Sequence, residues 1–98
     1  MLEVGIKGCA QVQVTNENTA KAVGSGFLSV FATPMMAALM EKTAAESVQG
    51  ELGEGEGTVG TSLNIRHLAA TPVGMTVKCE SELVEIDRRR LVFTLKVT

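Results

Sequence analysis

Three side chains capable of acid–base or nucleophilic chemistry stand out in this chain of 98 residues. His67 is the one histidine, Glu41 interrupts the apolar stretch "MMAALMEK", and Thr33 stands directly before a proline. An imidazole or a carboxylate can move a proton, and a carboxylate or hydroxyl can attack an electrophile when its surroundings activate it. Together these residue types are sufficient for a hydrolytic reaction.

Each of the three side chains also has an ordinary structural explanation. Thr33 suits the N-cap of a helix, where its hydroxyl accepts a hydrogen bond from a backbone N–H. Glu41 can lie at the flank of a helix or pair with a lysine, and His67 can be a histidine at the edge of the core. The chain contains no G-x-S-x-G, no H-E-x-x-H and no cysteine cluster. Taken singly, none of these residues predicts a reaction.

The stretch "FATPMMAALMEKTAAES" predicts one long helix over residues 34–48. Thr33 is the expected N-cap, Pro34 suits the first turn, and Gly50 supplies the stop. A stripe at three- and four-residue spacing predicts packing against a sheet, with further apolar residues widening it. The stripe comprises Met36, Leu39, Met40 and Thr43. We expect Leu39 and Met40 to be buried and the helix to be enclosed on most sides.

Alternating or apolar segments at 4–15, 58–68, 75–86 and 91–98 predict four strands. Residues 16–26 are polar and then glycine-rich, which indicates a turn or a short helical piece. Residues 50–57 form an acidic, glycine-rich connector. The order is one strand, one helix and a meander of three strands. It indicates a single α+β domain over residues 1–98, with one antiparallel sheet wrapped around a central helix.

The charge and the composition narrow the classes of partner that this chain could bind. The net charge is −2 and aromatic residues make up 3% of the chain, so the core is aliphatic. The run Arg88 to Arg90 lies between two predicted strands, which favours a solvated turn over a nucleic-acid patch.

The absence of a long apolar run and of a signal-like N-terminus predicts a soluble cytoplasmic protein without membrane contact. Cys9 and Cys79 match no metal spacing; two unpaired thiols are expected, with a disulfide left open.

The helix and the strand that follows it carry a resemblance. The segments "ATPMMAALME" and "VGTSLNIRHLAATPVG", with their separation, resemble the hot-dog-fold thioesterases, and most closely their fluoroacetyl-CoA thioesterase branch. The resemblance covers nearly the whole chain. It implies hydrolysis of an acyl-CoA thioester, with no cofactor because CoA is part of the substrate. Family members usually carry one more strand after the position where this sequence stops, so a missing C-terminal strand is expected.

The resemblance also implies roles for particular residues. Thr33, Glu41 and His67 occupy the catalytic positions, and Gly60 occupies the position whose backbone N–H contacts the thioester carbonyl. Glu41 would attack directly or act as general base on water, and these two roles stay open. We expect a general short-chain acyl-CoA or an uncharacterised acyl-CoA, rather than fluoroacetyl-CoA, as the substrate. The alternatives are a non-catalytic acyl-CoA binding or sensing module on the same fold and a purely structural domain.

The spacing of Thr33 and Glu41 bears on assembly. Eight residues of helix separate their backbones by about 12 Å, which two short side chains cannot bridge. Hot-dog proteins are similar in that they pair through their sheets and place sites between protomers. We therefore predict a homodimer with composite sites, or a tetramer built from such dimers.

Overall fold

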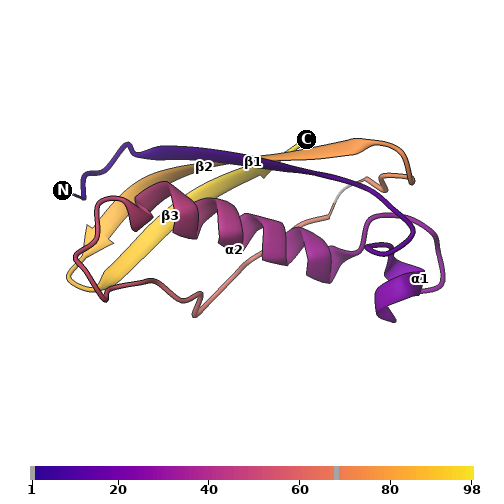
Figure 1. Cartoon of the computed structure of the whole chain (residues 1–98), viewed down its shortest axis with the longest axis horizontal. Coiled ribbons are helices and arrows are strands. Elements are labelled where there is room, and N and C mark those ends of the chain that lie inside the picture. The colour runs from indigo at the N-terminus through magenta and orange to yellow at the C-terminus, as the bar shows by residue number, and fades with distance from the viewer. Residues whose placement is uncertain (1, 68) are drawn as a thin grey trace.

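A computed structural model describes residues 2–67 and 69–98. One three-stranded antiparallel sheet, in the order β1-β2-β3, carries a long helix along one face (Figure 1). The elements are β1 (Lys7–Gln13), α1 (Ala20–Val23), α2 (Thr33–Gln49), β2 (Thr76–Asp87) and β3 (Arg90–Val97). The predicted α+β class, the long helix and three of the four predicted strands are confirmed. No helix within the described residues is long and apolar enough to cross a membrane.

The start of α2 differs from the prediction by one residue. Ala32 occupies the N-cap with extended backbone angles (φ −75°, ψ 137°) and makes no side-chain capping bond. Thr33 is therefore the first helical residue, and the prediction that it is the N-cap is wrong. Pro34 sits in the first turn, where its missing N–H costs no intrahelical bond, so the helix can begin just before it. The Thr33 hydroxyl is consequently not used for capping.

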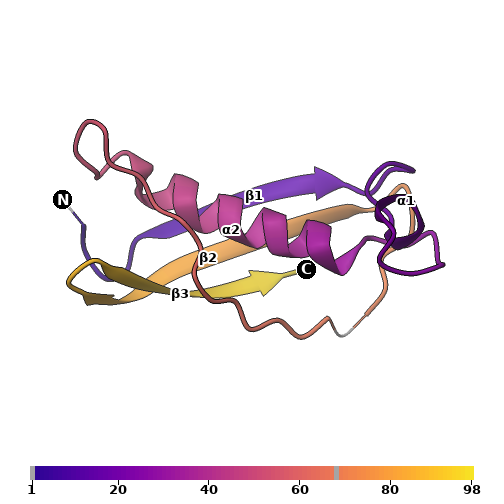
Figure 2. The ribbon, with the colours of Figure 1, turned by 90° about the horizontal axis from the view of Figure 1, so that it is seen from below.

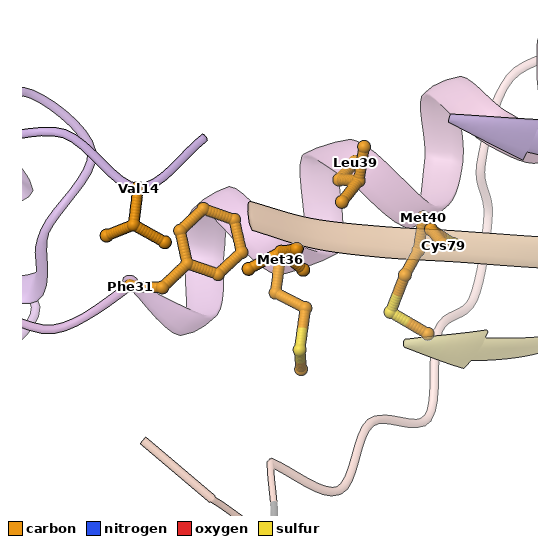
Figure 3. Packing of buried hydrophobic residues seen from close by; sticks show 7 residues of the cluster. Val14, Phe31, Met36, Leu39, Met40 and Cys79 are labelled. Carbon is orange, nitrogen blue, oxygen red and sulfur yellow. The ribbon is translucent and has the colours of Figure 1, made fainter. Parts of the chain in front are cut away.

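One face of α2 packs on the sheet and the opposite face does not. The buried face joins residues of the strands and of the loop before the helix in one core, part of which Figure 3 shows. The core cluster comprises Val14, Phe31, Met36, Leu39, Met40, Val77 and Cys79. The predicted burial of Leu39 and Met40 is confirmed. Ala38, Glu41 and Lys42 lie exposed, so the prediction of an enclosed helix is wrong for the single chain. The sheet can cover only the side that it contacts.

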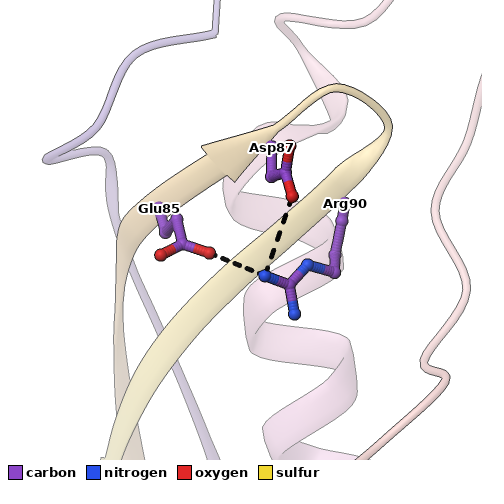
Figure 4. Close-up of polar contacts among 3 residues, drawn as sticks. All are labelled: Glu85, Asp87 and Arg90. Carbon is purple, nitrogen blue, oxygen red and sulfur yellow. Dashed lines mark hydrogen bonds and ion pairs between the residues drawn. The ribbon is translucent and has the colours of Figure 1, made fainter.

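The arginine run lies in the turn between β2 and β3, as predicted. Asp87 pairs with Arg90 in the strand register, and Arg88 has a φ of 57°. The Arg90 guanidinium donates to the Glu85 carboxylate at 2.8 Å and lies 3.9 Å from that of Asp87 (Figure 4). All three side chains are more than half exposed, so these ion pairs contribute at most about 1 kcal/mol. The run closes a solvated hairpin.

The predicted strand at 58–68 is not formed. Residues 58–67 have no strand assignment, and Leu68 lies outside the described residues. Within the described chain, no backbone group of residues 58–67 makes a backbone hydrogen bond. Val59 is 83% exposed. Alternating residues favour an extended backbone, but a strand also needs a neighbouring strand to bond with. Here the segment returns along α2 and past the end of β3 (Figure 2) without such a neighbour.

The two cysteines are both free, as expected from their separation in sequence. Cys9 is exposed on β1, whereas Cys79 of β2 is fully buried beneath α2. Burial raises the pKa of the Cys79 thiol, the Glu80 carboxylate adds to the rise, and a hydrogen bond with Thr43 opposes it. A thiol held protonated in the core behaves as a small apolar side chain.

The closest approach between α2 and the sheet occurs at Gly8 of β1. A Cβ added at Gly8 would lie 2.6 Å from Ser47 Cβ, 2.9 Å from Ser81 Oγ and 3.1 Å from the Thr43 carbonyl oxygen. Two of these neighbours belong to α2 and cannot retreat unless the helix moves, whereas Ser81 Oγ of β2 can rotate away. The missing side chain of Gly8 therefore sets the separation of the helix from β1.

We predict that Gly8→Ala destabilises the protein by about 1–3 kcal/mol, the usual cost of overpacking a close contact. Urea unfolding followed by circular dichroism measures the change. Gly50→Ala is the matched control, because a Cβ at Gly50 meets nothing within 4 Å and its φ of −68° suits any residue. Equal stabilities of the two variants would contradict the close packing assigned to Gly8.

Candidate active site

The Thr33 hydroxyl and the His67 imidazole form a direct contact. Thr33 Oγ1 lies 2.7 Å from His67 Nδ1. In the tautomer protonated at Nε2 the hydroxyl donates to Nδ1, and in the other tautomer Nδ1–H donates to the hydroxyl oxygen. His67 is half-buried and Thr33 is exposed. The pair therefore presents a hydroxyl and a titratable ring side by side at the start of α2.

Backbone contacts on one side of this pair hold the two segments together. The Phe31 N–H donates to the Thr71 carbonyl at 2.8 Å, and Val30 bridges to Pro72. These contacts lie two and three residues before Thr33 and four and five residues after His67. Because the backbones are joined this close to both side chains, the separation between hydroxyl and ring has little freedom to change.

Glu41 and Gly60 form a second pair. A Cβ built on Gly60 would run into the Glu41 carboxylate, lying 3.0 Å from its Cδ. The carboxylate approaches the backbone of residue 60 this closely because residue 60 is a glycine. The Gly60 N–H makes no hydrogen bond within the described chain. A free N–H donor and a carboxylate thus stand next to each other on the exposed side of α2.

The predicted set of four residues is therefore present as two pairs, Thr33 with His67 and Glu41 with Gly60. Along α2 the pairs are about 12 Å apart, because eight residues separate Thr33 from Glu41. The returning segment contacts α2 at both positions, in antiparallel order. An enclosed helix would desolvate Glu41 in part, but in the single chain Glu41 is exposed.

A partly open pocket of about 450 Å³ lies beside the first pair. His67 and Ile65 line it from the returning segment, Met36 and Met40 from α2, and Leu95 from β3. Its size is within the range of small-molecule sites, and its lining mixes these apolar side chains with polar ones, among them Asn64 and Arg66. An apolar group in the pocket would lie against one side of His67. No cluster of three or more His, Cys, Asp or Glu within residues 2–67 and 69–98 could hold a metal ion.

Sequence comparison assigns the chain to a family. The family model described as fluoroacetyl-CoA-specific thioesterase matches residues 14–98. A fluoroacetyl-CoA thioesterase of Streptantibioticus cattleyicolor is 43% identical over 65 residues, which cover 66% of this chain and 47% of that protein. The matched region thus spans about half the length of this curated relative.

Solved structures support the same placement. A mutant of the fluoroacetyl-CoA-specific thioesterase FlK, in complex with fluoroacetate and CoA, superposes with a TM-score of 0.92 at 30% identity, covering 99% of this chain and 82% of that chain. A hot-dog-like protein from Thermanaerovibrio acidaminovorans gives a TM-score of 0.87 at 21% identity, covering 98% and 71%, and shows the fold alone. The fold is thus of the hot-dog type. The chain belongs to the fluoroacetyl-CoA-specific thioesterase family, and the predicted resemblance is confirmed.

The Thr33–His67 contact predicts a spectroscopic change. Because His67 is the one histidine, a histidine-labelled sample gives one pair of ring ¹⁵N resonances. Thr33→Val keeps the shape of the side chain and removes its hydroxyl, so the Nδ1 resonance should move away from its wild-type position. Thr58→Val, at an exposed threonine, is the control and should leave both resonances unchanged. Wild-type resonances in the Thr33→Val protein would contradict the hydrogen bond.

Proposed function

We propose that this protein is an acyl-CoA thioesterase, which hydrolyses a thioester to a carboxylic acid and free CoA. The observation that carries the proposal is the contact between Glu41 and the backbone of Gly60. A thioester carbonyl oxygen that accepts a hydrogen bond from the Gly60 N–H places its carbonyl carbon within reach of the Glu41 carboxylate. Family membership, with relatives named as fluoroacetyl-CoA thioesterases, supports the same reaction.

The reaction needs an attacking oxygen, stabilisation of the oxyanion and departure of the thiolate. Glu41 supplies the first, either by attacking the carbonyl itself or by taking a proton from an attacking water. The Gly60 N–H donates to the developing oxyanion, a contribution worth about 3–4 kcal/mol when such a donor is well aimed. The C–S bond then breaks and CoA thiolate, a good leaving group, takes up a proton. In the direct attack this leaves a mixed anhydride between the acyl group and Glu41, which water hydrolyses to the carboxylic acid and the free Glu41 carboxylate.

The Thr33–His67 pair serves proton transfer in this proposal. His67 holds or deprotonates water, and the Thr33 hydroxyl fixes the orientation of the ring through Nδ1. The ring atom Nε2 is then the one that can face a reactant. The aliphatic part of the pocket beside His67 suits a short apolar acyl chain. A general short-chain acyl-CoA remains our proposed substrate.

We further propose that the working unit is a homodimer with composite sites, acting in the cytoplasm. In one chain the two pairs lie about 12 Å apart along α2, too far for short side chains to act on one thioester. Two α2 helices packed antiparallel about a two-fold axis would bring the Thr33 end of one beside Glu41 of the other. The unpaired segment 58–67, with Val59 exposed, and the exposed side of α2 offer the surface for such contact.

Replacement of Glu41 tests the assigned reaction. We expect Glu41→Gln to lower kcat for short-chain acyl-CoA hydrolysis by at least about a hundredfold, the range for loss of a catalytic base, without loss of the fold. Release of CoA, followed with a thiol reagent, measures the rate. Glu46→Gln is the control, since Glu46 is an exposed carboxylate on the same helix. Near-normal turnover in Glu41→Gln together with an inactive His67→Ala would show that Glu41 has another role.

A panel of acyl-CoA substrates separates the enzyme from the binding module. Short, branched and aromatic acyl-CoAs are incubated with the wild-type protein, and CoA release and acyl-CoA binding are measured on the same samples. Turnover of at least one substrate supports the enzyme. Binding without turnover favours the acyl-CoA binding module, and the absence of both favours a structural role.

Complementation tests the composite site. Thr33→Ala and Glu41→Gln chains, each expected to be inactive alone, are mixed under conditions that allow subunits to exchange. Heterodimers should regain up to one working site, because the intact Thr33–His67 pair of one chain meets the intact Glu41–Gly60 pair of the other. Verified heterodimers without activity, or a fully active monomer at low concentration, would overturn the shared site.

A further inference from the structure

Asn18 is a buried polar residue to which the reaction proposed above assigns no role. It lies in the turn between β1 and α1 and is 7% exposed. The stretch "TNENT" predicts no more than a polar turn, so the sequence pattern alone did not single it out. Buried amide side chains are retained where their hydrogen bonds are satisfied, and those of Asn18 have partners on both sides of the amide.

The side chain of Asn18 stabilises the turn in which it lies through two hydrogen bonds. Its Nδ2 donates to the Gln13 carbonyl at 3.0 Å, and its Oδ1 accepts from the Thr15 N–H at 2.9 Å. Gln13 is the last residue of β1, so the bond to its carbonyl ties the turn to the end of the sheet, and the bond from Thr15 closes the turn itself. The position of the Asn18 backbone is therefore set by the sheet.

The main chain of Asn18 in turn holds the start of α2. The Asn18 carbonyl accepts from the Ala32 N–H at 3.0 Å. Ala32 is fully buried, occupies the N-cap and has no side chain able to cap the helix. Its own carbonyl accepts from the Met36 N–H at 2.9 Å in the first turn. The helix start is thus located by a bond to Asn18 rather than by a capping side chain.

Ala32 is the residue immediately before Thr33. A continuous path of hydrogen bonds and main chain therefore runs from β1 through the Asn18 amide and the Ala32 backbone to the hydroxyl that contacts His67. We infer that Asn18 is a positioning residue, which fixes Thr33 against His67 without touching the substrate. Its effect on catalysis depends on the proposed thioesterase function, whereas its effect on the ring of His67 does not.

The primary test is the ¹⁵N spectrum of the single histidine. In Asn18→Ala the turn loses both side-chain bonds, so the His67 Nδ1 resonance should move from its wild-type position toward that of Thr33→Val by at least half of the difference. Asn18→Asp keeps the acceptor for Thr15 and loses the donor to Gln13, so it should give a smaller shift. Asn16→Ala is the matched control at an exposed asparagine two residues away and should match the wild type.

The kinetic test separates positioning from general destabilisation. We expect Asn18→Ala to lower kcat by about ten- to a hundredfold, the cost of a small displacement of a catalytic group, with KM nearly unchanged. Asn18→Asp should restore part of the lost kcat. Loss of thermal stability with wild-type kcat and wild-type His67 resonances would show a purely structural role and overturn the inference.

A measurement on the wild-type protein covers the case in which Asn18→Ala does not fold. Hydrogen exchange should show the Ala32 amide to be protected, and Asn18→Asp should speed its exchange more than that of amides in the middle of α2. Exchange of Ala32 at the rate of an exposed loop in the wild type would overturn the inference. Absence of thioesterase activity in the wild type would overturn the proposed function alone, because the spectra and the exchange rates still test the position of Thr33.

Discussion

The backbone hydrogen bond from the Phe31 N–H to the Thr71 carbonyl is the contact on which the candidate site depends. It joins the residues just before α2 to the segment that returns along the helix. Since the chain is pinned there, the returning segment runs antiparallel to α2, and His67 falls beside Thr33 while Gly60 falls beside Glu41. Both pairs therefore depend on the path of residues 58–67, which form no strand.

Small residues permit the close approaches that this path requires. Gly8 lets α2 settle on β1, and Gly60 lets the Glu41 carboxylate reach the backbone of the returning segment. Ala32, buried and without a polar side chain, leaves the capping of α2 to a backbone partner. In a hot-dog fold the central helix provides both the core and the site, so its contacts with the sheet and with the returning segment bear on function as well as on stability.

Part of the exposed surface of the single chain lies beside the candidate site. Glu41 and Val59 are exposed, and the backbone of residues 58–67 has unpaired donors and acceptors within the described chain. Unpaired strand-like backbone favours pairing with another chain. A composite site would therefore use the surface that the monomer leaves uncovered, and would desolvate a carboxylate that the monomer exposes to water.

The sequence by itself determined the long helix, three strands, the fold class and the identity of the four candidate residues. These features rest on local patterns: three- and four-residue spacing in α2, alternation in β1 and β2, and a resemblance carried by short contiguous segments. Leu39 and Met40 were predictably buried because their spacing places them on one helical face.

Only the tertiary structure decided which of the four candidate residues contact one another. The pairing of Thr33 with His67 across 34 positions depends on how the returning segment is tied near both residues. The same holds for the unformed strand at 58–67, because alternation describes the residues of a segment and not the presence of a neighbour to bond with. The role of Asn18 was likewise hidden, since its amide bonds and the bond from Ala32 to its carbonyl exist only when β1, the turn and α2 are brought together.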